Sequence, residues 1–322
     1  MSSLPVPVEP DAATQMEAFA RAVDARDPRF DGVFFVAITT TRIYCRPVCP
    51  SRMANNRHRR FFHSAAAAEH AGFRPCLRCR PELAPGRSFF DVVSRLAHSA
   101  ALRIEAGALN GASVMDLARD LGVSERHLRR ALEREIGVSP LDLAQTHRLL
   151  LAKQLLVDTG ISVTRVAFAS GFQSLRRFNT AFREQYRMPP SALRRKLSPR
   201  RNGSSPEDNV LRLTLGYRRP FAWKAHVALL QGEAIQGIES VDRDRYSRTI
   251  RIGPHTGYFT VRDAEPSHPR TGRIASHLDV EISASLVPAL MPLIARLRYV
   301  FDLDAEPGKI DAHLEQGGLA DL

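Results

Sequence analysis

Two stretches of the sequence decide the fold of its first part: Phe35-Val-Ala-Ile-Thr-Thr-Thr-Arg-Ile-Tyr-Cys45-Arg-Pro-Val-Cys49 and Gly72-Phe-Arg-Pro-Cys76-Leu-Arg-Cys79. They carry all 4 cysteines of the 322-residue chain, as two close pairs separated by 26 residues. The start of the chain has no signal-peptide pattern, so we expect a cytoplasmic, reducing environment in which disulfides are disfavoured. Four thiolates without a histidine in the pattern predict a tetrahedral Zn²⁺ site formed by Cys45, Cys49, Cys76 and Cys79.

The residues around the cysteines predict a small α+β domain over 11–83. Phe19 and Val23 recur at helical spacing in the first segment. Gly32–Ile38 has the composition of a buried strand, and His63–His70 that of an alanine-rich helix.

A domain of this size has a small core and depends on its metal. We expect chelation of zinc to unfold residues 16–81 and to leave the helices of Asp91–Arg195 unchanged. Pro81–Gly86 is the expected linker between the two regions.

Both cysteine stretches closely resemble the N-terminal domain of the Ada family of methyl-phosphotriester repair proteins, over about Met16–Pro81. The resemblance implies that Cys45 is the catalytic methyl acceptor and that the other three cysteines complete its zinc site. The family's phosphate-contacting positions correspond here to Thr41, Arg52, Arg74 and Arg78. Arg42 departs from the family pattern, which has a small residue there, and we count it among the expected phosphate contacts.

The chemistry of a zinc-bound thiolate agrees with that role. A methyl phosphotriester carries no charge, and its methyl carbon is open to in-line attack by a soft nucleophile. Zinc keeps Cys45 deprotonated at neutral pH, so no separate general base is required. The thioether formed is inert, which predicts a stoichiometric S-methyltransferase whose every molecule reacts once. The alternative is a closed zinc ribbon in which all four sulfurs only hold the fold together.

Residues 88–197 have a helical pattern that contains an internal repeat. The pattern of Leu117–Leu132 recurs about 50 residues later over Val166–Phe182, and one long helix over Leu141–Val157 connects the copies. Serines and glycines fall where a helix-turn-helix unit needs its cap and turn. The second helix of each copy then presents polar side chains to DNA: Arg126, His127, Arg129, Arg130, Arg176, Arg177 and Asn179.

The second copy contains the motifs Gly171-Phe-Gln-Ser174, Phe178, Phe182-Arg183 and Pro189-Pro-Ser191. They resemble the DNA-binding domain of AraC/XylS-type regulators, over about Asp91–Arg195. The resemblance implies an all-α double helix-turn-helix domain whose two recognition helices read the major groove on one face of double-stranded DNA. It also implies that the following side chains form the core: Leu117, Leu128, Leu132, Phe168, Phe172, Phe178 and Phe182.

Charge is distributed unevenly along the chain, whose formal net charge is +12. Residues 1–201 contain 32 Lys+Arg against 18 Asp+Glu, and the remainder contains 14 against 16. A basic, arginine-rich first part favours DNA phosphates as the binding partner. The sequence contains no apolar run of about 18 residues, so no membrane partner is expected.

Residues 209–322 predict a third domain of α+β class, after a polar linker over Ser198–Asn209. Three segments alternate apolar and polar residues as half-buried strands do: Leu211 with Leu213 and Leu215, Tyr258 with Thr260, and Leu278 with Val280 and Ile282. Two helices are expected between them, over Phe221–Gln231 and Leu286–Leu297.

The segments Asn209–Trp223, Gly237–Ser240 and Leu303–Pro307 resemble the small N-terminal domain of AlkA-type alkylpurine DNA glycosylases. In that family the catalytic aspartate and the helix-hairpin-helix belong to a later, helical domain. We therefore expect the catalytic glycosylase domain to be absent from this sequence, which ends at Leu322.

Together these features predict a sensor of DNA alkylation. It would transfer a methyl group irreversibly from DNA methyl phosphotriesters to zinc-bound Cys45, and then activate alkylation-repair genes at promoter sites together with RNA polymerase. Two alternatives remain open. One is an AraC-type regulator with purely structural zinc, in which the four sulfurs react alike. The other is a part of a 3-methyladenine DNA glycosylase fusion protein whose first domains only deliver it to DNA.

Overall fold

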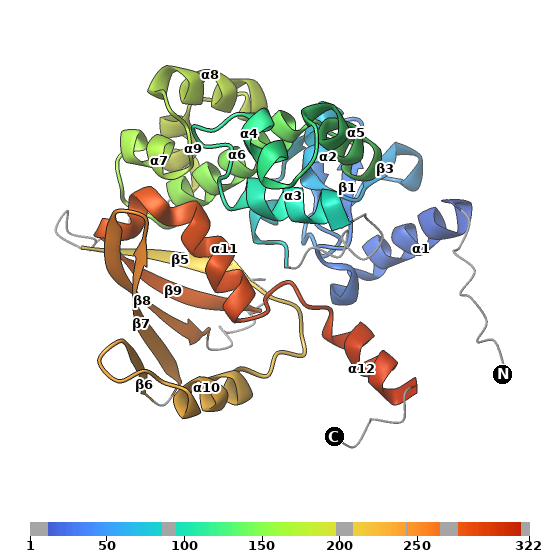
Figure 1. Cartoon of the computed structure of the whole chain (residues 1–322). Helices are drawn as coiled ribbons and strands as arrows, with labels where there is room; N and C mark the ends of the chain where they lie inside the picture. Colours follow the sequence, from blue (N-terminus) through green and yellow to red (C-terminus); the bar gives the residue numbers. More distant parts are fainter. Residues whose placement is uncertain (1–11, 86–94, 198–208, 243, 265–275, 317–322) are drawn as a thin grey trace.

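The computed structural model describes residues 12–85, 95–197, 209–242, 244–264 and 276–316 (Figure 1). Within these ranges the chain forms a small α+β domain, an all-α domain and a second α+β domain, which confirms the predicted fold class. The predicted domain starts at residues 11 and 88, and the predicted linker 198–208, lie outside the described residues. No helix of the described part is long and apolar enough to cross a membrane.

The first domain is built on a four-stranded sheet of order β3-β1-β2-β4. Strand β1 pairs antiparallel with β2 and β3, whereas β2 pairs parallel with β4. Phe19 of α1 stacks on Phe34 with ring centroids 4.0 Å apart, and Val23 lies in the same core. The elements are α1 (Ala12–Ala25), β1 (Phe35–Ile38), β2 (Ile43–Cys45), β3 (Arg59–Phe62), α2 (Ala65–His70) and β4 (Arg74–Pro75).

The expected linker at Pro81–Gly86 is wrong in its first residues. Pro81–Leu83 forms a short 3-10 helix, η3, that contacts the long helix of the second domain. Pro81 is buried, and the Glu82 carboxylate is almost completely enclosed. A proline in a turn pattern predicts a chain reversal, but the pattern does not tell whether the reversal is packed or free.

The part of the second domain that the structure describes, residues 95–197, contains seven helices, with the predicted repeat in its expected places. Helices α4 and α5 form the first helix-turn-helix unit, α7 and α8 form the second, and α6 connects them. The bounds are α3 (Arg95–Glu105), α4 (Val114–Asp120), α5 (Glu125–Ile136), α6 (Pro140–Asp158), α7 (Val163–Ala169), α8 (Leu175–Tyr186) and α9 (Pro190–Leu197).

Serine caps and turn glycines fix these boundaries. Ser113 and Asp116 form a reciprocal capping box at the start of α4, and Ser124 caps α5. The turn between α7 and α8 needs Gly171, whose φ is +90° and whose missing Cβ would lie 2.4 Å from the Asn110 side chain. Only glycine fits both restrictions.

Phe168 was expected in the core, and that expectation is wrong. Its side chain is 52% exposed, whereas the other six members of the predicted core set are buried. In α7 the inward positions at helical spacing are Val166, Ala167 and the following Ser170, so Phe168 points outward. The Val-Ala-Phe-Ala run is apolar on all sides, and its composition alone does not give the buried face.

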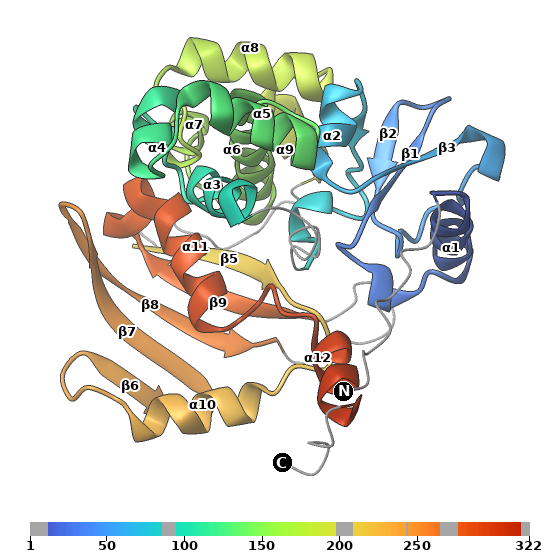
Figure 2. The same ribbon diagram turned by 45° about the vertical axis from the view of Figure 1, so that its right-hand side comes forward.

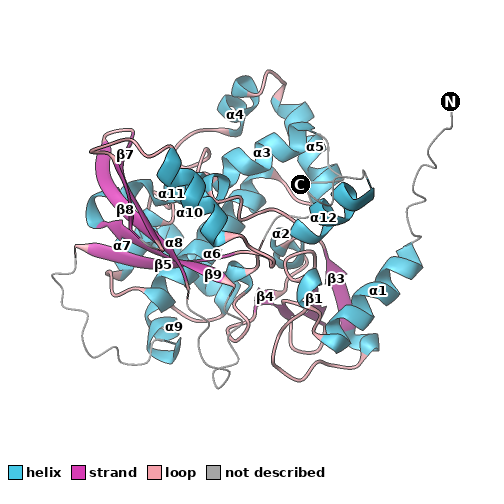
Figure 3. Ribbon diagram, turned by 90° about the horizontal axis from the view of Figure 1, so that it is seen from below, coloured by secondary structure: helices cyan, strands magenta, loops and turns pink. Residues whose placement is uncertain are grey.

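The third domain is a five-stranded antiparallel sheet of order β5-β9-β8-β7-β6, covered on one face by α10 and α11 (Figure 3). The elements are β5 (Val210–Gly216), α10 (Trp223–Gly232), β6 (Glu239–Asp242), β7 (Arg245–Ile252), β8 (His255–Asp263), β9 (His277–Ser283), η6 (Ala284–Ala289), α11 (Leu290–Val300) and α12 (Pro307–Gln316).

The strand expected around Tyr258 exists, but its alternation is shifted by one residue. Phe259 and Val261 face the core, whereas Tyr258 is 45% exposed. A shift of one residue exchanges the two faces of a strand, so the predicted inward side was the solvent side. Strand β7 was not predicted, although Tyr246, Ile250 and Ile252 alternate along it.

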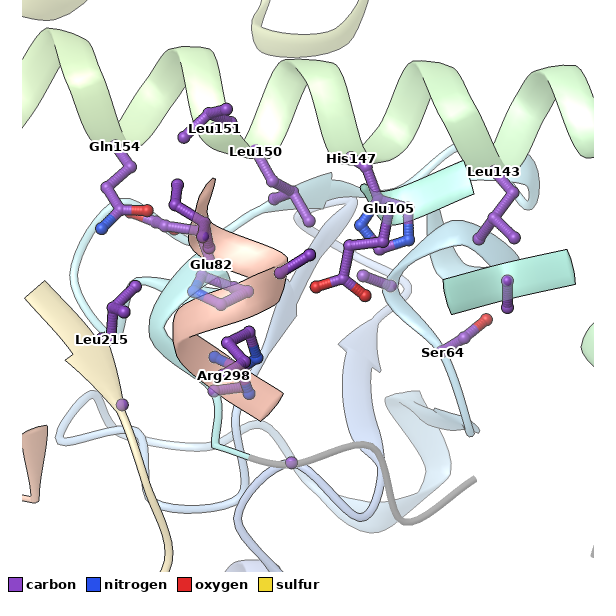
Figure 4. Close-up of a pocket in the computed structure, with 18 of the residues that line it drawn as sticks. Ser64, Glu82, Glu105, Leu143, His147, Leu150, Leu151, Gln154, Leu215 and Arg298 are labelled. Atoms are coloured by element: carbon purple, nitrogen blue, oxygen red, sulfur yellow. The ribbon is translucent and has the colours of Figure 1, made fainter. Parts of the chain in front are cut away.

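The second and third domains share one apolar core. One apolar cluster runs from α6, α7 and α8 into the sheet and helix α11 of the third domain. A cavity of about 220 Å³ lies where all three domains meet (Figure 4), and it is lined by Glu82, Glu105, His147 and Arg298 among other residues. Helices α5 and α8 lie on the side of the molecule away from the third domain's sheet (Figures 1 and 2).

Candidate metal centre

The four cysteines come together because β2 and β4 lie side by side. Tyr44 pairs with Pro75 across the two strands, and the Cys76 N–H donates to the Tyr44 carbonyl at 2.9 Å. Cys45 therefore ends β2 beside Cys76, and each strand is followed by a short loop that returns a second cysteine. All four Sγ atoms lie within 4.8 Å of one another. A tetrahedral thiolate site with Zn–S bonds of about 2.3 Å needs such a spacing, so the residues fit the metal.

Backbone hydrogen bonds distinguish the sulfurs. The Arg46 N–H donates to Cys79 Sγ at 3.4 Å, and the Arg78 N–H donates to Cys76 Sγ at 3.3 Å. A backbone hydrogen bond from Ser51 reaches the Cys49 sulfur. Among the described residues, none donates a backbone N–H to Cys45 Sγ.

This difference has a chemical consequence. A hydrogen bond stabilises the charge of a thiolate and lowers its nucleophilicity. Cys45 is therefore the sulfur whose electron pair is least engaged by the protein. Exposure does not make the same distinction, because Cys45 is 5% exposed and Cys76 and Cys79 are each 8% exposed.

A buried ion pair holds the loop that follows Cys45. The Arg46 guanidinium bonds both oxygens of Asp31 and donates to the Cys79 carbonyl at 3.3 Å. Arg46 thus connects the two cysteine loops twice: its side chain donates to the Cys79 carbonyl, and its backbone N–H donates to Cys79 Sγ. Asp31 was not identified from the sequence, because a lone Asp before a strand carries no signal of its partner.

The predicted phosphate contacts come from the two segments of the chain that carry the cysteines. Thr41, Arg42, Arg52 and Arg78 are exposed, and Arg74 is half-buried. Thr41 and Arg42 lie in the turn between β1 and β2, and the Arg42 carbonyl accepts from the Arg74 N–H at 2.9 Å. Each of the five residues lies within four positions of a cysteine in the sequence, and we refer to the five together as the rim of the cluster.

Arg42, which departs from the family pattern, has a defined position. Its φ is +56°, in the left-handed region, and its guanidinium lies 5.3 Å from the centre of the Phe73 ring. The side chain is therefore held against Phe73 by a cation–π contact and stays near the rim.

The predicted contacts of the helix-turn-helix units lie on α5 and α8. Arg126, His127, Arg130, Arg176 and Arg177 are exposed, as major-groove contacts must be. Arg129 is half-buried and pairs with Glu125 one turn earlier, with nitrogen and oxygen 2.6 Å apart. Asn179 is also only partly exposed.

Sequence reasoning missed a buried polar network between the first two domains. Lys153 of α6, 0% exposed, donates to the Cys76 carbonyl and pairs with Glu82. Arg80 pairs with Glu82 and with Asp158. The available signal was the position of Lys153 within the apolar run Leu149–Val157, because a lysine in such a run is buried and needs a buried partner.

Comparison with known proteins is consistent with this architecture. A four-cysteine metal module joined to two helix-turn-helix units defines a class of metal-containing regulators. Residues 18–82 match the metal-binding domain of Ada, residues 117–196 match a helix-turn-helix domain, and residues 212–321 match the AlkA N-terminal domain. The chain thus contains an Ada-type metal-binding domain, a helix-turn-helix domain and an AlkA-type N-terminal domain, and zinc is the metal of its cysteine cluster.

Individual relatives agree with this assignment. A probable bifunctional transcriptional activator/DNA repair enzyme AlkA of Mycobacterium tuberculosis is 37% identical over 90% of this chain and 56% of its own length. The bifunctional transcriptional activator/DNA repair enzyme Ada of Escherichia coli is 34% identical over 47% of this chain and 41% of its own length. A solved structure of the methylated N-Ada/DNA complex is 34% identical, covers 41% of this chain and 96% of that chain, and has a TM-score of 0.21. The chain thus spans about half the length of the curated relatives it matches.

Proposed function

We propose that this chain is a DNA-alkylation sensor in which Cys45 accepts a methyl group from a DNA methyl phosphotriester. The observation that supports Cys45 over the other ligands is the pattern of backbone hydrogen bonds to sulfur: within the described residues Cys49, Cys76 and Cys79 each receive one, and Cys45 receives none. The mycobacterial and Escherichia coli relatives are described as transcriptional activators and DNA repair enzymes, which supports the same pairing of activities.

The transfer forms one bond and breaks one bond. Zinc, when bound, keeps the four sulfurs as thiolates. The Cys45 Sγ electron pair forms the new S–C bond to the methyl carbon, and the C–O bond of the phosphotriester breaks. The departing oxygen keeps its electron pair and restores the charged phosphodiester. Arg46, fixed by Asp31, connects the loop that follows the nucleophile to the Cys79 carbonyl.

DNA would contact two separate surfaces. The rim of the cluster, with Thr41, Arg42, Arg52, Arg74 and Arg78, would hold the backbone around the damaged phosphate. The exposed faces of α5 and α8 would read a promoter. Activation at that promoter requires RNA polymerase as a further partner.

The experiment is an intact-mass measurement after incubation with methylated double-stranded DNA. We expect the wild-type chain to gain one methyl group per molecule and Cys45→Ser to gain none. The control is Arg126→Ala, which alters the promoter-reading face and should still gain the methyl group. Uptake by Cys45→Ser equal to the wild type would show that another residue accepts the methyl group.

A further inference from the structure

Lys153 is a completely buried cation whose ammonium group contacts residues of another domain. It belongs to α6, the connecting helix of the helix-turn-helix domain. Its ammonium group faces the first domain, residues 12–85, which we call the zinc module. Nζ donates to the Cys76 carbonyl at 3.0 Å and lies 2.5 Å from Glu82 Oε2. A lysine is almost never fully buried without a partner, and the two groups that Lys153 contacts here, the Cys76 carbonyl and Glu82, both come from the zinc module.

The surrounding charges complete a neutral network. Arg80, the residue after Cys79, contacts Glu82 Oε1 at 3.0 Å through Nε. Its two terminal nitrogens bind both oxygens of Asp158 at 2.7 and 2.8 Å. Two cations therefore alternate with two carboxylates, and α6 supplies one of each. This arrangement holds α6 against the residues that flank the second cysteine pair.

The strand that leads to Cys76 is also held by the second domain. The Gln185 side chain of α8 donates to the Phe73 carbonyl at 3.2 Å. Cys76 is bonded within its own domain through its N–H, which reaches the Tyr44 carbonyl. Its carbonyl is bonded by Lys153. The backbone of this ligand is thus fixed on one side by the zinc module and on the other side by α6.

We propose that Lys153 is a positioning residue for the zinc cluster, supplied by the helix-turn-helix domain. By holding the Cys76 carbonyl it fixes the backbone from which the Cys76 thiolate reaches the metal. The docked helix α6 thus adds a restraint on the Cys76 backbone that the zinc module does not supply itself. The inference rests on the zinc site and is independent of methyl transfer by Cys45.

The test measures metal retention in the complete 322-residue chain. The zinc-loaded wild type, Lys153→Met and Gln154→Leu are mixed with a chromophoric chelator, and the rate of zinc release is followed. Gln154 is the matched control, because it is the next residue of α6, is also buried, and donates to Thr214 of the third domain instead. We expect release to be roughly 10-fold faster in Lys153→Met and unchanged in Gln154→Leu, because loss of a group that orients a ligand typically weakens metal binding by that order.

A second readout separates positioning from general support of the fold. Cobalt replaces zinc in each variant, and its visible absorption reports the geometry of the four thiolates. We expect a changed spectrum for Lys153→Met and a wild-type spectrum for Gln154→Leu. An unchanged spectrum in both variants would overturn the proposal.

A double variant removes the effect of unbalanced charge. Lys153→Met together with Glu82→Gln leaves Arg80 paired with Asp158, but the Cys76 carbonyl still has no donor from α6. The proposal predicts that zinc release stays fast in the double variant, which also serves if the single variant does not fold. Recovery of the wild-type rate would show that Lys153 only balances Glu82 and would overturn the proposal. A wild-type chain that binds no zinc would overturn the metal site itself, a result distinct from equal rates in all variants.

Discussion

At the residue scale, the sequence indicates which four residues bind the metal, whereas only the structure shows how the four sulfurs differ. The spacing of the cysteines predicted that four sulfurs meet, and the structure brings them within 4.8 Å. What separates Cys45 is the absence, among the described residues, of a backbone donor to its sulfur, whereas Cys76 and Cys79 each receive one. Hydrogen bonds to sulfur depend on the exact path of the loops, which the spacing does not contain.

Glu69 provides a prediction for the dependence of stability on pH. Burial raises the pKa of this carboxyl to about 7, against which its hydrogen bonds from Thr146 and Tyr44 act. A raised pKa in the folded state means that the folded chain binds the proton more tightly than the unfolded chain does. Glu69 therefore destabilises the fold progressively as pH rises from the ordinary value of 4.5 to about 7.

Replacing Glu69 with Gln should remove that decline. We expect the free energy of unfolding of Glu69→Gln to exceed that of the wild type by an amount that grows across this pH window, up to about 3 kcal/mol at neutral pH. Denaturant titrations of both chains at pH 5 and pH 7.5 measure the difference. A difference that is the same at both pH values would contradict the assigned titration.

At the element scale, the helices that begin with a serine cap were the most predictable. Ser113, Ser124 and Ser174 mark the starts of α4, α5 and α8 in both sequence and structure. Short apolar segments were the least predictable, because α7 and β8 each place on the surface an aromatic residue expected inside, Phe168 and Tyr258. Which face of such a segment is buried depends on the neighbouring element.

Substitutions on the two recognition helices should affect promoter binding, whereas substitutions in the rim of the cluster should affect methyl uptake. Arg126→Ala or Arg176→Ala should weaken binding to one promoter by about 1–3 kcal/mol, because each exposed guanidinium can contact a base edge. Arg74→Ala should slow methyl uptake from any methylated DNA, since that side chain lies beside the cluster. Promoter titration and methyl uptake are measured for all three variants. Equal loss of both activities in every variant would argue against two independent contact surfaces.

At the scale of the whole molecule, the domains are more closely joined than the sequence suggested. The sequence predicted three separate units with linkers, but residues 81–83 pack against α6. Thr146 of α6 bonds Glu69 at 2.9 Å, and Lys153 bonds Cys76. Both contacts join residues 77 positions apart through single polar side chains, and no local pattern marks them.

This interface changes the expected result of removing zinc. The sequence alone led us to expect that chelation would leave the second domain unchanged. Lys153 is buried against the zinc module, and unfolding of that module would take away Glu82, the carboxylate that pairs with it, which costs several kcal/mol. We therefore expect chelation to increase amide hydrogen exchange in α6 as well as in residues 16–81. Strands β7 and β8 are the control, and unchanged exchange in α6 would contradict the coupling.

We expect methylation of Cys45 to make this chain bind its promoter more tightly. Zn²⁺ with four thiolates carries a formal charge of two minus, and one thioether reduces it to one minus beside DNA phosphates. At an effective dielectric constant of about 20 and a separation of about 6 Å, one charge contributes on the order of 2–3 kcal/mol before screening. That corresponds to roughly 30- to 100-fold in affinity, and salt reduces it.

The measurement that tests this claim most directly is a titration of labelled promoter DNA with the unmethylated and the Cys45-methylated chain at two salt concentrations. We expect the methylated chain to bind more tightly, and the difference in affinity between the two forms to become smaller as the salt concentration rises. Equal affinities of the two forms at low salt would contradict it.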